Sequence, residues 1–177
     1  METPWRLLDE STIAHCKGVG KIAAQLAKIV GVDEELVYHA AIWHDTGKSK
    51  MLDIVQKEGK LTDEEFARIK SHPTLGYEII MKEYEGNDKF KVARIALHHH
   101  NRADGTGYPV SKEDEKITNE MQVIQLADVL EALTAKRPYK KEIPFEEAKQ
   151  MIIDGKCGYF TEKMKKALSK INSEDID

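Results

Sequence analysis

The sequence predicts an all-α protein. Apolar residues recur at helical spacing in one segment after another, and no stretch of four to eight residues alternates as a half-buried strand does. Residues that start or stop helices, such as Gly31, Asp33 and Gly155, fall between these segments. The 177 residues contain no internal repeat and no linker-like tract, so we expect one domain over residues 1–177.

The first two helices are predicted from spacing and from their ends. The first carries apolar residues on one face: Ile13, Val19, Ile22, Leu26 and Ile29. Gly31 suits the end of this helix, and Asp33 suits the N-cap of the next one. The second helix should stop near Thr46 and Gly47.

The remaining helices follow from similar signals. Thr62 and Glu65 form a capping-box pattern, and Pro73 suits the first turn of another helix. Residues 90–99 and 119–135 have helical periodicity, whereas residues 102–111 are rich in glycine and should form a loop. Two shorter helices should begin near Pro144 and Thr161.

Composition excludes several classes of protein. Lysine and arginine total 27 against 31 acidic residues, so the net charge of -4 disfavours a binder of nucleic-acid polymers. No uncharged run approaches the roughly 20 residues that a membrane helix needs, which predicts no membrane association. The N-terminus has no signal-peptide pattern, and two cysteines suit a reducing compartment. We therefore expect a cytoplasmic protein.

Histidines and carboxylates carry the functional signal. All seven histidines lie between His15 and His100, and Asp128 interrupts the apolar face of its helix. Taken alone, each has an ordinary interpretation as a core histidine, a helix cap or a solvated residue. Several inward polar residues in one small helical domain instead indicate a shared site, because buried imidazoles and carboxylates need partners. Imidazole nitrogen and carboxylate oxygen suit iron, manganese or zinc better than calcium or magnesium.

The order of motifs resembles the HD-GYP subgroup of the HD-domain metal-dependent phosphohydrolases. The motifs are, in order, His15, His44-Asp45, Gly47-Lys48, His72-Pro73, His99-His100, Asp104-Gly105-Thr106-Gly107-Tyr108-Pro109, Asp128 and Arg137-Pro138-Tyr139. The resemblance runs from about Ser11 to Phe160. It implies a five-helix HD core with a C-terminal helical extension, a centre of two or three metal ions, and hydrolysis of cyclic di-GMP to the linear dinucleotide or on to GMP.

The resemblance also assigns roles to residues. The implied metal ligands are His15, His44, Asp45, His72, His99, His100 and Asp128. Asp45 matches the carboxylate that bridges two metals, and Lys48 matches a lysine that assists the leaving group. Gly107 and Tyr108 match the loop that shapes the substrate pocket. Arg137 and Lys140 match a basic pair that contacts substrate phosphate, although without the family a solvated helix end is their simpler interpretation.

Three departures from the family pattern affect these expectations. Asn101 replaces a glutamate that supports the metal site, and Ala103 replaces a tryptophan. Ser11 stands where members with three metals often have a glutamate, so we expect two divalent ions, iron or manganese first and zinc or nickel as alternatives. His39 and His98 match no ligand position.

Three functions remain open from the sequence. The first is a cyclic di-GMP phosphodiesterase, and the second is an HD-type phosphohydrolase acting on another cyclic dinucleotide or phosphoester. The third is a catalytically impaired signalling or binding module, which the intact ligand set disfavours. The family also suggests that a signalling-protein partner binds through the loop at Gly107 and Tyr108.

Overall fold

The computed structural model describes residues 3–110, 115–136 and 141–176. Within these ranges the chain forms α-helices joined by short turns, with no strand longer than a single bridge between Asn101 and Gly107. The helices are α1 (Glu10–Val30), α2 (Glu34–Trp43), α3 (Leu52–Val55), α4 (Asp63–Ile69), α5 (His72–Glu83), α6 (Lys89–His98), α7 (Asn119–Thr134), α8 (Phe145–Ile153) and α9 (Glu162–Ser169). The predicted all-α class is confirmed.

The ends of α1 and α2 lie where the sequence signals place them. Gly31 follows α1 with φ of 79°, a left-handed conformation that glycine adopts without a steric penalty. The Asp33 side chain then accepts a hydrogen bond from the backbone N–H of Leu36, 3.0 Å away, and so caps α2. Side-chain caps such as this one typically stabilise a helix by about 1 kcal/mol.

The later helices also follow their predicted signals. Thr62 and Glu65 form both hydrogen bonds of a capping box at α4, and Pro73 lies in the first turn of α5. The short α3, together with the 3₁₀ turn Thr46–Lys50 before it, was not predicted. Four residues are too few to show a helical period, so the sequence pattern could not reveal this helix.

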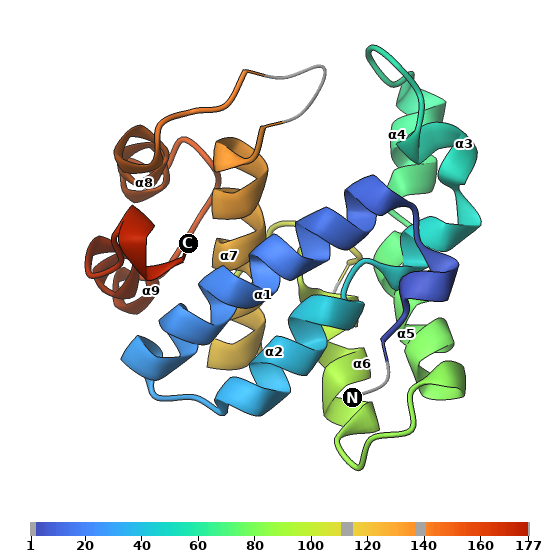
Figure 1. The fold of residues 1–177 in the computed structure, drawn as a ribbon, viewed down its shortest axis with the longest axis horizontal. Coiled ribbons are helices and arrows are strands. Elements are labelled where there is room, and N and C mark those ends of the chain that lie inside the picture. Colours follow the sequence, from blue (N-terminus) through green and yellow to red (C-terminus); the bar gives the residue numbers. More distant parts are fainter. Residues whose placement is uncertain (1–2, 111–114, 137–140, 177) are drawn as a thin grey trace.

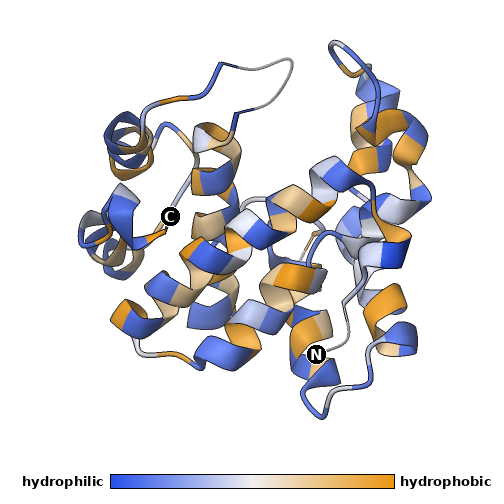
Figure 2. Ribbon diagram, viewed as in Figure 1, coloured by the Kyte–Doolittle hydropathy of each residue, from blue (hydrophilic) through white to orange (hydrophobic). Residues whose placement is uncertain are grey.

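The helices pack around a shared apolar core. Helix α1 packs against α2 and α7, and α5 packs against α6 (Figure 1). Helices α8 and α9 lie beside α7, at the opposite side of the view from α3 and α4 (Figure 1). Apolar and hydrophilic residues alternate along the helices, as amphipathic packing requires (Figure 2). The buried side chains include Leu26, Trp43, Ile124, Leu130 and Met164.

Among the described residues, no helix combines the length and the apolar character needed to cross a lipid bilayer.

Candidate metal centre

Five helices bring the predicted ligands to one place in the interior. His15 comes from α1, and His44 and Asp45 directly follow α2. His72 begins α5, His99 and His100 directly follow α6, and Asp128 comes from α7. A glycine allows this convergence, because a Cβ atom at Gly47 would overlap the carbonyl oxygen of His72. The turn after Asp45 can therefore lie directly against the start of α5.

Asp45 occupies the middle of this cluster. Its carboxylate is 1% exposed, and each oxygen faces two imidazole nitrogens. Oδ1 lies 3.2 Å from His72 Nε2 and 3.7 Å from His99 Nε2. Oδ2 lies 3.5 Å from the Nε2 atoms of both His15 and His44. The carboxylate thus divides the histidines into two groups, one on each oxygen.

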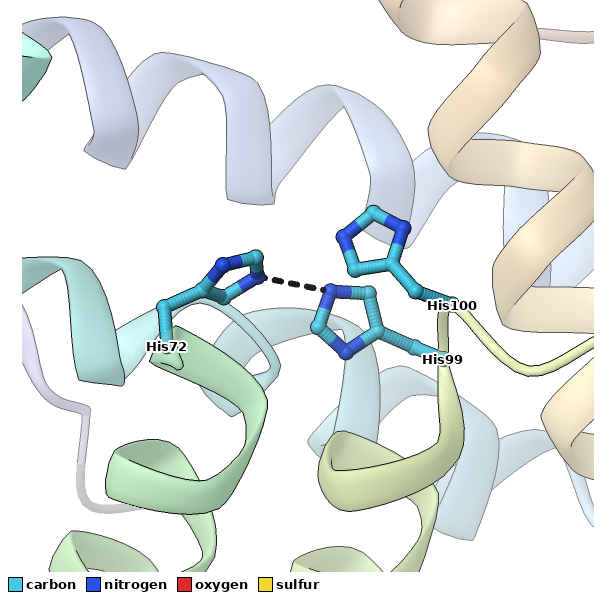
Figure 3. Close-up of side chains that lie close together, drawn as sticks. All are labelled: His72, His99 and His100. Atoms are coloured by element: carbon cyan, nitrogen blue, oxygen red, sulfur yellow. Dashed lines mark hydrogen bonds between the residues drawn. The ribbon is translucent and has the colours of Figure 1, made fainter. Parts of the chain in front are cut away.

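Each group is completed by one further side chain. His72, His99 and His100 form one set whose ligand atoms all lie within 4.8 Å of one another, and Figure 3 shows their rings turned toward each other. The second set has the same compactness and consists of His15, His44 and Asp128. The structure therefore brings all seven predicted ligands together as two triads that share Asp45.

Backbone carbonyls fix the orientation of the histidine rings. The Nδ1 atoms of His44, His72 and His99 lie 2.7, 2.7 and 2.6 Å from the carbonyl oxygens three residues earlier in the chain. A carbonyl can only accept, so each Nδ1 carries the hydrogen and donates it. The Nε2 lone pairs then point into the cluster, which is the arrangement that metal-binding histidines use.

This orientation places two acceptors face to face. His72 Nε2 and His99 Nε2 lie 3.1 Å apart, joined by the dashed line in Figure 3. Because both rings already donate through Nδ1, a hydrogen bond between the Nε2 atoms requires an additional proton on one ring. A cation between the two lone pairs satisfies both rings without that proton.

Two buried atoms of this cluster also lack hydrogen bonds. His44 Nε2 and Asp45 Oδ1 are fully enclosed and make none. An unpaired buried acceptor costs about 1–3 kcal/mol, so such atoms call for a ligand. Nitrogen and carboxylate donors around a shared carboxylate suit a pair of divalent transition metals. The residues present therefore fit the metal ions that the sequence motifs imply.

Comparison with known proteins identifies the family. The HD domain family model matches residues 6–160, most of the chain. The chain belongs to the HD-domain family. Proteins of this family depend on metal ions, in agreement with the two triads.

Curated relatives of this HD domain are named cyclic di-GMP phosphodiesterases or 3'3'-cGAMP-specific phosphodiesterases. A cyclic di-GMP phosphodiesterase of Vibrio cholerae is 40% identical over 71% of this chain and 27% of that protein. The 3'3'-cGAMP-specific phosphodiesterase 3 of Vibrio cholerae is 34% identical over 86% of this chain and 34% of that protein. The chain thus spans about a third of the length of these relatives. They are consistent with the HD-GYP subgroup that the motifs indicate.

A solved structure supports the fold. The HD domain of the phosphodiesterase PgpH from Listeria monocytogenes has a TM-score of 0.64 and 21% identity, covering 89% of this chain and 87% of that one. The predicted HD core is confirmed at the level of fold.

Burial keeps most histidines of the HD-domain site neutral. It lowers the pKa of His44, and it lowers the pKa of His100 to about 3. Burial, together with the neighbouring His100, holds the pKa of His99 well below its usual range. Neutral imidazoles keep their lone pairs, and only this form binds metal.

The carboxylates and His15 behave differently. Burial opposes ionisation of Asp45, but the Lys48 ammonium overcomes it and holds the pKa of this carboxyl well below its usual range. Burial likewise opposes the charge on His15, yet hydrogen bonds to Asp128 and Glu131 raise the pKa of this histidine to about 9. Asp128 Oδ1 lies 3.0 Å from His15 Nε2. The second triad therefore contains an ionised carboxylate, which the first triad lacks.

A cavity opens beside the predicted metal ligands. Its volume is about 290 Å³, and its walls include His15, His72, His100, Lys48, Tyr108 and Asp128. Lys48 Nζ lies 2.5 Å from Asp45 Oδ2, and Asp45 raises the pKa of this lysine against the effect of burial. The Tyr108 ring stacks on His100 with centroids 4.5 Å apart. The predicted pocket residues Lys48 and Tyr108 thus face the same space as the ligands.

Two further residues at this site were not predicted from the sequence. The carboxylate of Glu131 on α7 contacts His15 Nδ1, and a Cβ atom at Gly18 would lie 2.8 Å from the Glu131 side chain. Glu131 follows Asp128 by three residues, a helical spacing that could have revealed it. The buried thiol sulfur of Cys16 also lies within 4.8 Å of a ligand atom of His44 and of Asp45. Burial raises the pKa of this thiol well above the usual value.

Other predicted residues lie apart from the ligands or outside the described ranges. His39 is half-buried and bonds to Asp88 rather than to the cluster. His98 is buried, but its Nδ1 bonds to the side chain of Asn101. Arg137 and Lys140, predicted to contact phosphate, lie outside the described residues.

Proposed function

We propose that this HD domain is a metal-dependent phosphodiesterase that hydrolyses cyclic di-GMP to the linear dinucleotide, to GMP, or to both. The observation that carries the proposal is the buried Asp45 carboxylate, whose two oxygens each face two histidine Nε2 atoms. Such an arrangement supports two cations that share one carboxylate. The names of the cyclic di-GMP phosphodiesterase relatives support the choice of substrate.

In this proposal each triad would hold one divalent ion, and Asp45 would serve both sites. His72, His99 and His100 would hold one ion, and His15, His44 and Asp128 would hold the other. Iron or manganese fits these donors best, and zinc or nickel is the alternative. When bound, such a pair lowers the pKa of a water and neutralises charge on the phosphate.

The chain's own residues orient and protonate the substrate. Lys48 remains an ammonium because Asp45 raises its pKa, so Nζ holds a proton that it can donate toward the leaving oxygen. It also presents fixed positive charge to the cavity that it lines. Tyr108 and Gly107 shape one wall, and Arg137 and Lys140 bind phosphate, the arginine through its two-pronged guanidinium.

The experiment is anaerobic purification with metal analysis, followed by incubation with cyclic di-GMP and separation of the products. Two metal ions per chain together with the linear dinucleotide or GMP would support the proposal. Retention of metal in the Arg137→Ala variant, with weaker substrate binding, would support phosphate contact by Arg137. Loss of metal in that variant would contradict this role.

A second substrate is favoured by one observation. The 3'3'-cGAMP-specific relative matches 86% of this chain, so the same site can be considered for a mixed cyclic dinucleotide. Cleavage of that compound without cleavage of cyclic di-GMP would transfer the proposal to this substrate. No bound metal under reducing conditions would contradict both enzymatic proposals and favour a binding module. A signalling-protein partner at the Gly107–Tyr108 loop stays a prediction, as does a cytoplasmic location.

A further inference from the structure

The loop after α6 folds back onto the histidines that precede it. Arg102 N–H donates to Thr106 O at 2.8 Å, and Tyr108 N–H donates to His100 O at 3.3 Å. Gly107 is essential to this return, because its φ is 98° and a Cβ atom there would overlap the carbonyl oxygen of His100. The return carries the Tyr108 ring onto His100, with an angle of 21° between the two ring planes.

One amide side chain joins the two ends of this loop. Asn101 is 2% exposed; its Nδ2 lies 2.6 Å from Pro109 O, and its Oδ1 lies 2.9 Å from His98 Nδ1. The Pro109 carbonyl can only accept, so the amide nitrogen must face it and the amide oxygen must face His98. His98 Nδ1 therefore carries the hydrogen. A carboxylate could accept from His98 but has nothing to donate to Pro109.

Neighbouring elements hold this amide in place. The Gln125 side chain on α7 donates to the backbone oxygen of Asn101 and lies 3.2 Å from that of His98. On the other side of the His98 ring, Nε2 lies 3.4 Å from Glu115 Oε1, and Glu115 pairs with Arg94. Asn101 is thus fixed by α6, by α7 and by the segment after the loop, which allows its side chain to set the position of Pro109.

We propose that Asn101 is a positioning residue that acts through Tyr108. Neither side-chain partner of Asn101 belongs to the two metal-ligand triads. Its amide instead anchors the residue that follows Tyr108, and Tyr108 forms a wall of the cavity beside the ligands. Asn101 therefore controls the affinity for substrate, through the position of Tyr108, and does not control the affinity for metal. This inference rests on the proposed phosphodiesterase activity.

The first test is Asn101→Asp, which preserves shape and the acceptor for His98 but places a carboxylate against the Pro109 carbonyl. We expect KM for cyclic di-GMP to rise about tenfold while kcat changes less than about twofold. Metal content should remain that of the unchanged protein. Asn87→Asp makes the same chemical change at an exposed position and serves as the control. If Asn101→Asp fails to fold, Asn101→Ala removes both bonds without the repulsion and should change KM in the same direction.

A double-mutant cycle separates positioning from a general structural role. In a Tyr108→Ala background, Asn101→Asp should add less than about twofold to KM, because the residue through which it acts is gone. A further tenfold rise in that background would overturn the proposal. Loss of metal in Asn101→Asp would overturn it as well, because the amide would then support the ligands.

Amide hydrogen exchange tests the loop without relying on activity. The Tyr108 amide, which donates to His100 O, should exchange at least about tenfold faster in Asn101→Asp than in the unchanged protein. An unchanged exchange rate would overturn the positioning role. Faster exchange in a protein that hydrolyses no cyclic dinucleotide would instead support the anchoring of the loop and contradict the proposed function alone.

Discussion

Among the clusters of this HD domain that pair histidine with carboxylate, those around Asp45 and around Asp88 differ most clearly, because only the first has the properties of a metal site. At Asp45, histidines converge on a buried carboxylate and leave His44 Nε2 and Asp45 Oδ1 without hydrogen bonds. In the middle of α2, His39 Nδ1 lies 3.0 Å from Asp88 Oδ2, and Tyr84 donates to Asp88 Oδ1 at 2.8 Å.

Cavity volume does not distinguish the two clusters. The hollow beside His39 and Asp88 measures about 370 Å³, more than the 290 Å³ beside the metal ligands. Among the described residues, compact groups of three ligand-type side chains occur only around Asp45 and its neighbours. Convergence and unsatisfied buried atoms therefore identify the metal centre, whereas a histidine–carboxylate pair in a hollow does not.

The largest effect should come from Asp45→Asn. The amide retains the shape but loses the negative charge and one acceptor oxygen, so it cannot bridge two cations. We expect hydrolysis to fall below detection and metal content to fall below two ions per chain. Product chromatography and metal analysis measure both, with circular dichroism to establish folding. Asp53→Asn is the matched control at an exposed carboxylate, and full activity of Asp45→Asn would show that the assigned centre is wrong.

Glu131→Gln should have the next largest effect. Glu131 contacts the nitrogen of His15 that points away from Asp128, so its charge makes the ligand nitrogen more basic and fixes the ring. Removing such a partner typically lowers metal affinity about 10- to 100-fold. Titration of the metal-free protein with manganese measures the change. Glu162→Gln, at an exposed carboxylate, should bind as the unchanged protein does; equal affinity of both variants would refute the role of Glu131.

The contrast between Asp45 and Glu131 shows how far the sequence predicts this site. Caps at Asp33 and Thr62 depend on a few consecutive residues, so the helix ends could be read locally. The seven predicted ligands, which the structure brings together, followed from motif order, because their types and sequence positions carry the resemblance. The spacing of Glu131 from Asp128 places both on one face of α7, but the contact of Glu131 with His15 depends on the packing of α7 on α1.

Asn101 shows the same limit. The motif pattern predicts that this residue replaces one that supports the metal site, but its amide bonds to His98 and to Pro109. The contact with Pro109 can be identified only when the path of the following loop is known. Hydrogen bonds that form because the chain folds back on itself cannot be inferred from the spacing of motifs.

A smaller loss of metal affinity is expected for Gly18→Ala. The new methyl group would lie 2.8 Å from Glu131 Cγ, so the Glu131 side chain must shift, which should disturb its contact with His15. Because the carboxylate remains and can adjust, we expect a loss of about 3- to 10-fold, less than for Glu131→Gln. The matched control is Gly20→Ala, whose methyl group meets the ring of Tyr38 instead. Manganese titration should distinguish them, and equal affinities would contradict the proposed contact.

The smallest effect should come from Asp88→Asn, in the cluster that lacks metal-site character. Burial opposes ionisation of Asp88, but hydrogen bonds from His39 and Tyr84 lower the pKa of this carboxyl below its usual value. A lowered folded-state pKa stabilises the protein above the unfolded-state pKa of about 4, and this contribution is lost as the pH falls through the folded-state value. The variant should thus be less stable by about 1 kcal/mol at pH 7, with a smaller difference at lower pH.

Urea unfolding of the metal-free protein at neutral and acidic pH measures this difference, and metal analysis provides the comparison with the other cluster. Metal content should be unchanged in Asp88→Asn, because neither His39 nor Asp88 belongs to a triad around Asp45. A stability difference that grew on acidification would contradict the lowered pKa of Asp88. Loss of metal would contradict the distinction between the two clusters, since it would mean that the hydrogen-bonded pair of His39 and Asp88 contributes to the centre.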